Sequence, residues 1–400
     1  MRCEDRGVQC GGYNFARVFV QQNSTIRNLA LADIKGYFLS RFVIDTKSPS
    51  ALVNILVRTV TSSPPHGSLQ DLCVQAITAS FYGTTQNNNH KLLEGVGAYT
   101  KALRKLREAL RDPSTCFTTE TVITVLCICI CENIVAQESS SWLSHYNAMS
   151  CLIESRGPDR HRTGIERDIL LACQYMIIVN AGTDRRPCFL SEPRWKALLE
   201  PLEYQGPSKY PALLYHIADV PGIFHRFDIL TTQGLSYSEF VSLRNDTIDA
   251  LHALHGWRST LPPYVSSPTR LPPTYTPNTT AALAFHHAVL LKMEEICNRL
   301  SIPLTPSAHV PEDGAANTLE RIETKRYLTT QIYNLARSSI NDMNSFPGAL
   351  YFILPLYVAS EFMDPAWPET TALSEYRDNV IAKSHGFHLG RELKKTVDLF

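Results

Sequence analysis

Residues 90 to 135 decide the fold class, and they read HKLLEGVGAYTKALRKLREALRDPSTCFTTETVITVLCICICENIV. In the first half, apolar residues recur every three or four positions with Lys and Arg between them, which is the period of an amphipathic helix. Asp112-Pro113 stops this helix, because proline cannot continue it. Thr118 then starts a second helix that is apolar nearly all round through Val135, which predicts a buried, central position.

The same helical periodicity continues outward from this stretch, and the alternation typical of strands is hard to find. Ser68 is expected to open the helix that precedes residue 90. Further helices are expected at 140–155, 164–180, 236–257, 279–300 and 319–343. The sequence therefore predicts an all-α fold, a multi-helix domain packed around one continuous apolar core.

A proline-rich segment at 261–277 separates two helical halves, and its Ser, Thr and Tyr content predicts a loop that crosses the surface. The predicted organisation is a separate N-terminal segment at 1–20, a linker with the first helices at 21–64, an N-terminal helical part at 65–260, the loop at 261–277 and a C-terminal helical part at 278–400.

Composition narrows the class of protein. Lys and Arg together number 38, as do Asp and Glu, and no basic face or tail stands out, which counts against direct nucleic-acid binding by this chain. Met1 to Asp5 begin no apolar signal core, so the 11 cysteines are expected to be reduced and buried rather than paired. The longest strongly apolar stretch, Val122 to Ile130, is too short to span a membrane. We expect a soluble, intracellular protein.

The amino-terminal stretch at 3–20 reads CEDRGVQCGGYNFARVFV. Cys3 and Cys10 are separated by six residues, and Gly11-Gly12-Tyr13 and Phe19-Val20 follow. This stretch resembles the end of the zinc cluster of the fungal Zn(II)2Cys6 transcription factors, a C-x2-C-x6-C run with similar flanking residues. The resemblance implies that Cys3 and Cys10 occupy the last two of the six zinc-ligand positions.

The cluster is incomplete in this chain, because each zinc ion needs four ligands and Cys3 and Cys10 supply two. By the C-x2-C spacing, the preceding cysteine would fall one residue before Met1. We therefore expect residues 1–20 to be a disordered remnant of the cluster that holds no zinc. Zinc and specific DNA binding are expected only where the missing part of the cluster is restored.

The central region resembles the regulatory domain of the same family. The shared features are an apolar helix that ends in Glu, a Trp-x2-His pair, an Arg-Gly-Pro terminator, a Phe-Leu … Trp element and a late apolar helix that begins near a Pro-Leu. In this chain they are Glu132, Trp142, His145, Ala148, Leu152, Ile153, Arg156-Gly157-Pro158, Phe189-Leu190, Trp195 and Leu354-Pro355-Leu356-Tyr357. A hydrogen-bonded core role is expected for His145, and core burial for Trp142.

The resemblance implies a transcription regulator of a fungal nucleus, controlling RNA polymerase II-type genes of metabolism or biosynthesis. It implies other regulators or a second copy of the chain as partners, a small-molecule effector, and no membrane. Two alternatives stay open. In the first, the chain is an adaptor or decoy regulator that no longer binds DNA and acts through protein contacts. In the second, it is a helical protein that binds a small molecule.

Two further groups of Cys and His residues are more typical of core packing than of a metal site. Cys127, Cys129 and Cys131 alternate on a helix and so point to different sides, which predicts core thiols and no metal site. A zinc site that spans two helices could be built from His252 and His255 of one helix and His286-His287 of the next. No Cys or carboxylate lies at a motif spacing from these histidines, so the site is not expected.

An enzyme is not expected. Asn341-Asp342-Met343-Asn344-Ser345 begins like a terpene-synthase metal motif, but Ala349 stands where that motif needs Glu and there is no aspartate-rich partner. Phosphate-binding loops and nucleophile elbows are also absent from the sequence.

Overall fold

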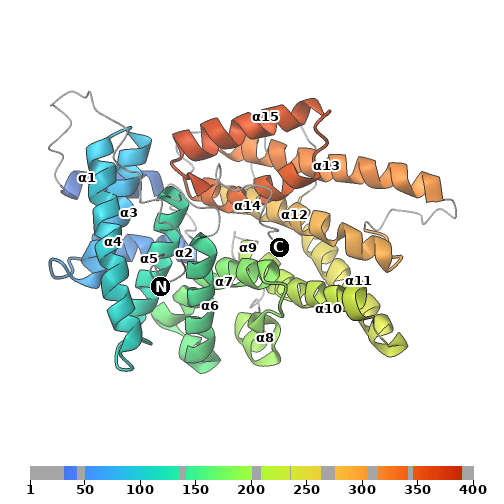
Figure 1. Ribbon diagram of the computed structural model, residues 1–400, viewed down its shortest axis with the longest axis horizontal. Coiled ribbons are helices and arrows are strands. Elements are labelled where there is room, and N and C mark those ends of the chain that lie inside the picture. The colour runs from blue at the N-terminus through green and yellow to red at the C-terminus, as the bar shows by residue number, and fades with distance from the viewer. Residues whose placement is uncertain are drawn as a thin grey trace, which may run out of the picture.

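Helices form every regular element in the described part of the chain, so the predicted all-α fold is confirmed (Figure 1). The computed structural model describes residues 31–42, 50–135, 141–200, 209–234, 236–262, 275–304, 314–340 and 346–389. The expected cluster remnant at 1–20, with Cys3 and Cys10, lies outside these residues, as does most of the proline-rich loop. No helix in the described part is both long and apolar enough to cross a bilayer.

In chain order the α-helices are α1 (Leu31–Phe42), α2 (Ala51–Thr61), α3 (Leu69–Thr85), α4 (Asn89–Arg111), α5 (Thr119–Val135), α6 (Ser141–Arg156), α7 (Gly164–Thr183), α8 (Pro193–Leu199), α9 (Tyr210–Ile217), α10 (Val220–Gln233), α11 (Tyr237–Ser259), α12 (Pro277–Arg299), α13 (Gly314–Ile340), α14 (Phe346–Phe362) and α15 (Pro368–Tyr376). Two short 3-10 turns, η4 (Pro158–His161) and η5 (Phe189–Ser191), and a π-helical turn, η6 (Arg377–Ser384), complete the list.

Helices α3 and α4 form a tightly packed antiparallel hairpin. Ser68 opens α3 as predicted, because its hydroxyl accepts a hydrogen bond from the backbone N–H of Asp71. A Cβ at Gly95 would lie 2.3 Å from Oγ and 2.5 Å from the backbone nitrogen of Ser80. Glycine is therefore needed there for the two backbones to approach so closely.

Helix α5 lies at the centre of the N-terminal half, against α3, α4 and α6 (Figure 1). Cys127, Cys129 and Cys131 are at most 1% exposed, which confirms the prediction of core thiols. Cys127 and Cys131 face the side where α3 supplies Cys73, whereas Cys129 faces Cys173 of α7. Burial raises the pKa of Cys127 to about 12, so the thiol is unreactive at neutral pH.

Helices α12, α13 and α14 pack side by side and form the C-terminal half (Figure 1). The prediction that a helix begins near Leu354-Pro355 is wrong, because Pro355 lies inside α14. Almost every described side chain around it is buried, and this burial outweighs the backbone hydrogen bond that proline removes.

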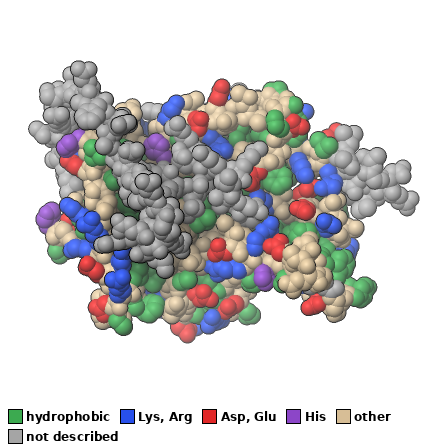
Figure 2. Space-filling model, viewed as in Figure 1, with side chains coloured by type: hydrophobic (Ala, Val, Ile, Leu, Met, Phe, Trp, Pro, Cys, Tyr) green, Lys and Arg blue, Asp and Glu red, His purple; other side chains and the backbone are tan. Residues whose placement is uncertain are grey.

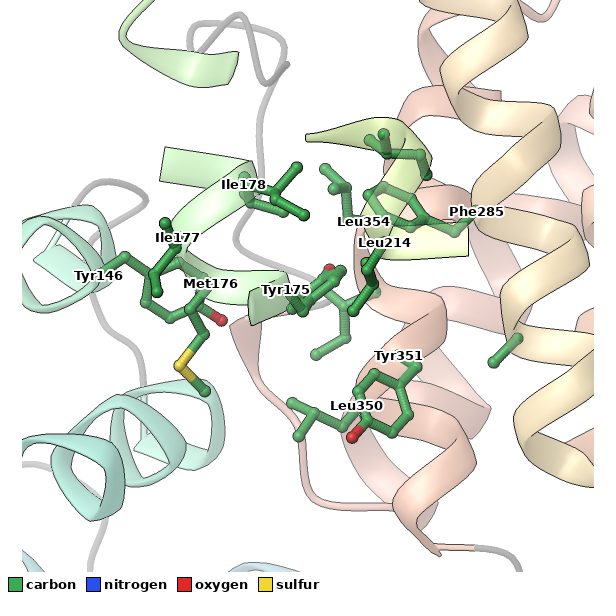
Figure 3. Close-up of a cluster of buried hydrophobic side chains, with 14 of the residues drawn as sticks. Tyr146, Tyr175, Met176, Ile177, Ile178, Leu214, Phe285, Leu350, Tyr351 and Leu354 are labelled. Carbon is green, nitrogen blue, oxygen red and sulfur yellow. The ribbon is translucent and has the colours of Figure 1, made fainter. Parts of the chain in front are cut away.

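One apolar core joins the two halves (Figure 3). The ring of Tyr175 in α7 lies 5.4 Å from that of Phe285 in α12 and 6.0 Å from that of Tyr351 in α14. Tyr210 of α9 lies 5.0 Å from Tyr351. These edge-on and tilted contacts are the geometry that aromatic pairs favour, so the predicted continuous core is confirmed for the described residues.

Candidate functional site

The motif residues of the central region meet in two buried polar clusters, each of which ties three or more helices together. The first, the Glu132 cluster, joins α4, α5 and α6. Tyr99 donates a hydrogen bond to Oε1 of Glu132, and the Oγ of Ser141 donates to Oε2 at 3.1 Å. Nε2 of His145 lies 3.5 Å from Oε1 of Glu132 and 3.4 Å from the hydroxyl of Tyr99.

The carboxylate of Glu132 is held in its charged form. Burial would raise its pKa, but hydrogen bonds from His145, Tyr99 and Ser141 outweigh burial, so the pKa is lowered. Burial and the neighbouring negative charge raise the pKa of Tyr99, so the phenol keeps its proton and stays a donor. The cluster thus gives His145 the hydrogen-bonded role that the sequence predicted.

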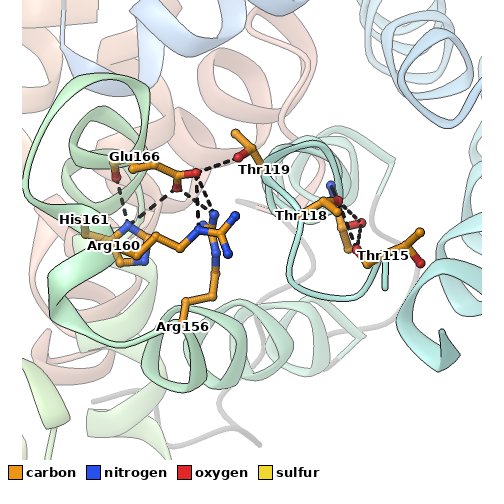
Figure 4. Close-up of polar contacts among 8 residues, drawn as sticks. Thr115, Thr118, Thr119, Arg156, Arg160, His161 and Glu166 are labelled. Atoms are coloured by element: carbon orange, nitrogen blue, oxygen red, sulfur yellow. Dashed lines mark hydrogen bonds and ion pairs between the residues drawn. The ribbon is translucent and has the colours of Figure 1, made fainter. Parts of the chain in front are cut away.

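The second, the Arg156 cluster, lies where α6 ends and α7 begins (Figure 4). Nη2 of Arg156 lies 2.8 Å from Oε1 and 2.7 Å from Oε2 of Glu166. Thr119, at the start of α5, donates to Oε1 at 2.6 Å, and Nε of Arg160 lies 3.6 Å from the same oxygen. The side chain of Arg156 is fully buried, so Glu166 is the counter-charge that makes this burial possible.

The Arg-Gly-Pro terminator works as the sequence predicted. Gly157 has φ 74°, a left-handed conformation that ends α6, and Pro158 begins η4 directly after it. The turn brings His161 under Glu166, where Nδ1 donates to the backbone oxygen of Glu166 at 2.9 Å. Burial lowers the pKa of His161, so this imidazole is neutral near pH 7.

The Phe-Leu … Trp element packs beneath the Arg156 cluster. The ring of Trp195, which is fully buried, lies 4.9 Å from that of Phe189 and 6.1 Å from that of His161. Residues that are 30 to 40 positions apart in the sequence therefore form one support for the α6–α7 turn. The bonds of both clusters connect different helices, whereas Nε and Nη1 of Arg156 and Nε2 of His161 are buried without a hydrogen-bond partner.

Histidines of α11 and α12 form a buried group in the C-terminal half. His255 and His286 have ring centroids 6.2 Å apart, and His286 and His287 are separated by 5.4 Å. Nε2 of His255 contacts the backbone oxygen of Leu304 at 2.9 Å, and His252 is exposed. Within the described residues, no three His, Cys, Asp or Glu side chains are arranged to hold a metal ion.

This histidine group makes stability depend on pH. Burial, with a contribution from Arg258, lowers the pKa of His287 to about 3, so the unfolded chain takes up the proton first as the pH falls below about 6.5. The stabilisation is complete above that pH. Lowering the pH from 7 to 5 should therefore reduce the free energy of unfolding by about 2 kcal/mol through His287 alone.

Urea unfolding followed by circular dichroism at several pH values tests this prediction. The slope of unfolding free energy against pH between 5 and 6.5 should become shallower in His287→Gln than in the parent. Identical slopes in the parent and in His287→Gln would show that folding does not shift the pKa of His287.

Two of the grooves on the described surface are lined by several cationic side chains. The α3–α4 groove has a volume of about 360 Å³ and is lined by His66, Gly67, Leu72, Gln75, Lys101, Arg104 and Lys105. The arginine groove has a volume of about 560 Å³ and is lined by Pro158, Asp159, Arg162, Arg167, Arg194, Ala197, Leu198 and Glu200. Neither groove was predicted, because each combines residues from segments that are far apart in the sequence.

The described residues thus form an all-helical domain with two buried polar clusters inside and charged grooves on its surface. Residues 42–309 match the family model of the fungal specific transcription factor domain, and the chain belongs to this family of regulators. The predicted resemblance is thereby confirmed for the regulatory domain. Cys3 and Cys10 lie outside both the match and the described residues, so their role as zinc ligands stays a prediction.

An uncharacterized protein of Emericella nidulans is 27% identical to this chain over 180 residues. The aligned stretch covers 45% of this chain and 37% of that relative, so the chain matches well under half of the relative's length. No solved structure matches the chain.

Proposed function

We propose that this chain regulates transcription in a fungal nucleus, on RNA polymerase II-type genes of metabolism or biosynthesis, through its helical domain. The family match over residues 42–309 is the observation that carries the proposal. In this role the domain contacts other regulators or a second copy of itself and responds to a small-molecule effector. The Glu132 cluster and the Arg156 cluster support the proposal. They hold together the helices whose outer surfaces form the two grooves, and neither cluster fills a groove, so a partner can contact these surfaces.

A tethering experiment tests the proposed role. The full chain is fused to a bacterial DNA-binding domain and expressed in yeast with a reporter gene that carries the matching operator. Reporter transcription should differ clearly from that with the DNA-binding domain alone, and a fluorescent fusion should enter the nucleus. The control is a fusion of the Glu166→Gln variant, which we expect to be destabilised because Glu166 is the counter-charge of the buried Arg156, and which should therefore lose the effect. An intact nuclear fusion that leaves the reporter unchanged would contradict the proposal.

Zinc content provides a separate prediction. Because a tetrahedral zinc site needs four ligands and only Cys3 and Cys10 of these 400 residues match the family positions, a purified polypeptide of these 400 residues should contain well under one zinc ion per chain. Mass-spectrometric metal analysis measures this ratio. Gel shifts should show no preference for inverted CGG half-sites over scrambled DNA, since two thiolates cannot fold the DNA-binding module.

The matched positive control is a fusion that supplies the missing cysteines at family spacing with a Lys- and Arg-rich loop. This fusion should hold two zinc ions and bind the half-sites. Stoichiometric zinc in the chain without this addition would contradict the assignment of Cys3 and Cys10 as an incomplete set.

A further inference from the structure

The turn between α2 and α3 carries an exposed serine that is followed by proline, Ser63-Pro64. Ser63 is exposed, and its hydroxyl makes no hydrogen bond to any residue that the structure describes. Figure 1 shows this turn beside α4, and in Figure 2 the blue side chains of Lys and Arg gather on that side of the molecule. The hydroxyl of Ser63 is therefore open to a group that approaches from solvent.

The backbone around Ser63 is already close to an extended form. Proline disfavours the helical conformation in the residue before it, so Ser63 cannot continue α2. Ser62, the C-cap of α2, is extended with ψ 156°, and Thr61 is the last residue of the helix and exposed. The ends of helices fray readily. Residues 61–65 can therefore lie extended in the cleft of an enzyme at the cost of one terminal helical residue.

Two other hydroxyls provide comparisons, because the fold uses both of them. The Oγ of Ser62 donates to a backbone oxygen of α2 at 2.6 Å and accepts from Nε2 of Gln70 at 2.8 Å. Thr276 is the other Ser or Thr that precedes a proline within the described residues, and it caps α12 by accepting from the backbone N–H of Thr279 at 3.2 Å. In the described part of the chain, Ser63 alone combines an unused hydroxyl with a following proline.

The sequence around Ser63 indicates which class of enzyme fits the turn. Val60 lies three residues before Ser63 and His66 three residues after it. The turn thus offers neither the arginine that basic-directed protein kinases select before their target nor the acid that acidic-directed kinases select after it. Pro64 has a fixed φ and no backbone N–H, which distinguishes it from every other residue type. Proline is therefore the feature by which a kinase would recognise this site.

The charges around the turn suit the addition of a phosphate, which carries about −1.5 to −2 charges at pH 7. Nζ of Lys105 lies 2.6 Å from the backbone oxygen of Gly67, so α4 brings a cation to the turn. Asp71 is the only acidic residue between Arg58 and Gln75, and it accepts hydrogen bonds from the backbone of Gly67 and from Gln75. These cations offset the repulsion between a phosphate and the C-terminal end of the α2 dipole.

We propose that Ser63 is a phosphorylation site for a proline-directed serine/threonine protein kinase. The Oγ of Ser63 attacks the γ-phosphorus of ATP held by the kinase, and the new O–P bond forms while the bond from that phosphorus to the bridging oxygen of ADP breaks. The hydroxyl proton passes to the carboxylate base of the kinase, and ADP leaves. The features of the turn alone carry this inference, which holds or fails whatever the tethering experiment shows.

Phosphorylation of the purified full chain tests the proposal. The chain is incubated with Mg-ATP and a recombinant mitogen-activated protein kinase, and mass spectrometry measures the phosphate at each site at early times. Ser63 should react about fivefold faster than Thr276, because the cap of α12 must open before Thr276 can react, and a typical cap contributes about this factor. Pro64→Ala should lose nearly all modification at Ser63. A basic-directed kinase, used in parallel, should leave Ser63 unmodified.

Two controls make a negative result informative. A synthetic Ser-Pro peptide in the same reaction shows that the kinase is active, and circular dichroism shows that Pro64→Ala keeps the fold. Unmodified Ser63 in the folded parent would overturn the proposal. A parental rate in Pro64→Ala would overturn it as well, because the kinase would then not be reading the proline. So would a rate at Thr276 equal to that at Ser63, because the exposure of the turn would then not select the site.

Discussion

Replacing Glu166 by Gln should lower the free energy of unfolding by about 3–5 kcal/mol. The substitution keeps the shape of the side chain and its ability to accept from Thr119, but it removes the charge that faces Arg156. The guanidinium of Arg156 is fully buried, so water cannot replace the lost carboxylate. A buried charge without a partner is among the most destabilising changes that one substitution can cause. Urea unfolding followed by circular dichroism at pH 7 measures this loss.

The ion pair between Asp159 and Arg162 supplies a control in the same turn. Their side chains are 84% and 68% exposed, so Asp159→Asn should cost at most about 1 kcal/mol. The double variant Arg156→Met/Glu166→Gln should recover part of the stability lost in Glu166→Gln, because it removes the unpaired charge. Similar small losses for Glu166→Gln and Asp159→Asn would mean that solvent reaches Arg156.

The central helices could be predicted because their signals are local. Ser68 and Asp112-Pro113 mark the start of α3 and the end of α4 from within a few residues, and the periodicity between them needs no tertiary information. The surface of α5 is apolar nearly all round, which likewise predicts that this helix is buried. These start, stop and periodicity signals do not depend on tertiary contacts, so they can be recognised in a single sequence.

Helices α8, α9, α10 and α15 were not predicted, and their prolines explain why. Pro193, Pro211, Pro221 and Pro368 look like breaks in the sequence. Each lies in the first turn of its helix, where the missing N–H has no partner to lose. The helices are also short, so they depend on packing against the core rather than on a periodic pattern of their own.

The site was predicted only in part. The resemblance singled out Glu132, His145, Arg156 and Trp195, but no spacing indicates that Tyr99 meets Glu132 or that Glu166 meets Arg156. Those pairs exist because separate helices cross, which is a property of the packed fold.

Replacing Trp142 by Ala should also cost about 3–5 kcal/mol in the free energy of unfolding. Trp142 is 3% exposed, as the sequence predicted, and its ring meets that of Tyr146 edge-on at 4.8 Å. Removing the indole leaves a cavity between α6 and its neighbours that the packed helices can close only partly. The substitution also loosens the helix that carries His145 toward Glu132. Chemical unfolding measured by tryptophan-independent circular dichroism reports the change.

Trp142→Phe separates packing from other roles of this side chain. Phenylalanine keeps a ring beside Tyr146 and fills most of the volume, so this variant should lose clearly less stability than Trp142→Ala. A midpoint that barely moves in Trp142→Ala would mean that the indole contributes nothing to the core. The face shared by Trp142 and His145 would then have to be considered as a binding surface. A large loss of stability in Trp142→Ala and a small loss in Trp142→Phe would show that Trp142 acts by packing in the core. In that case the loss of side-chain volume weakens the fold, and the loss of the indole nitrogen does not.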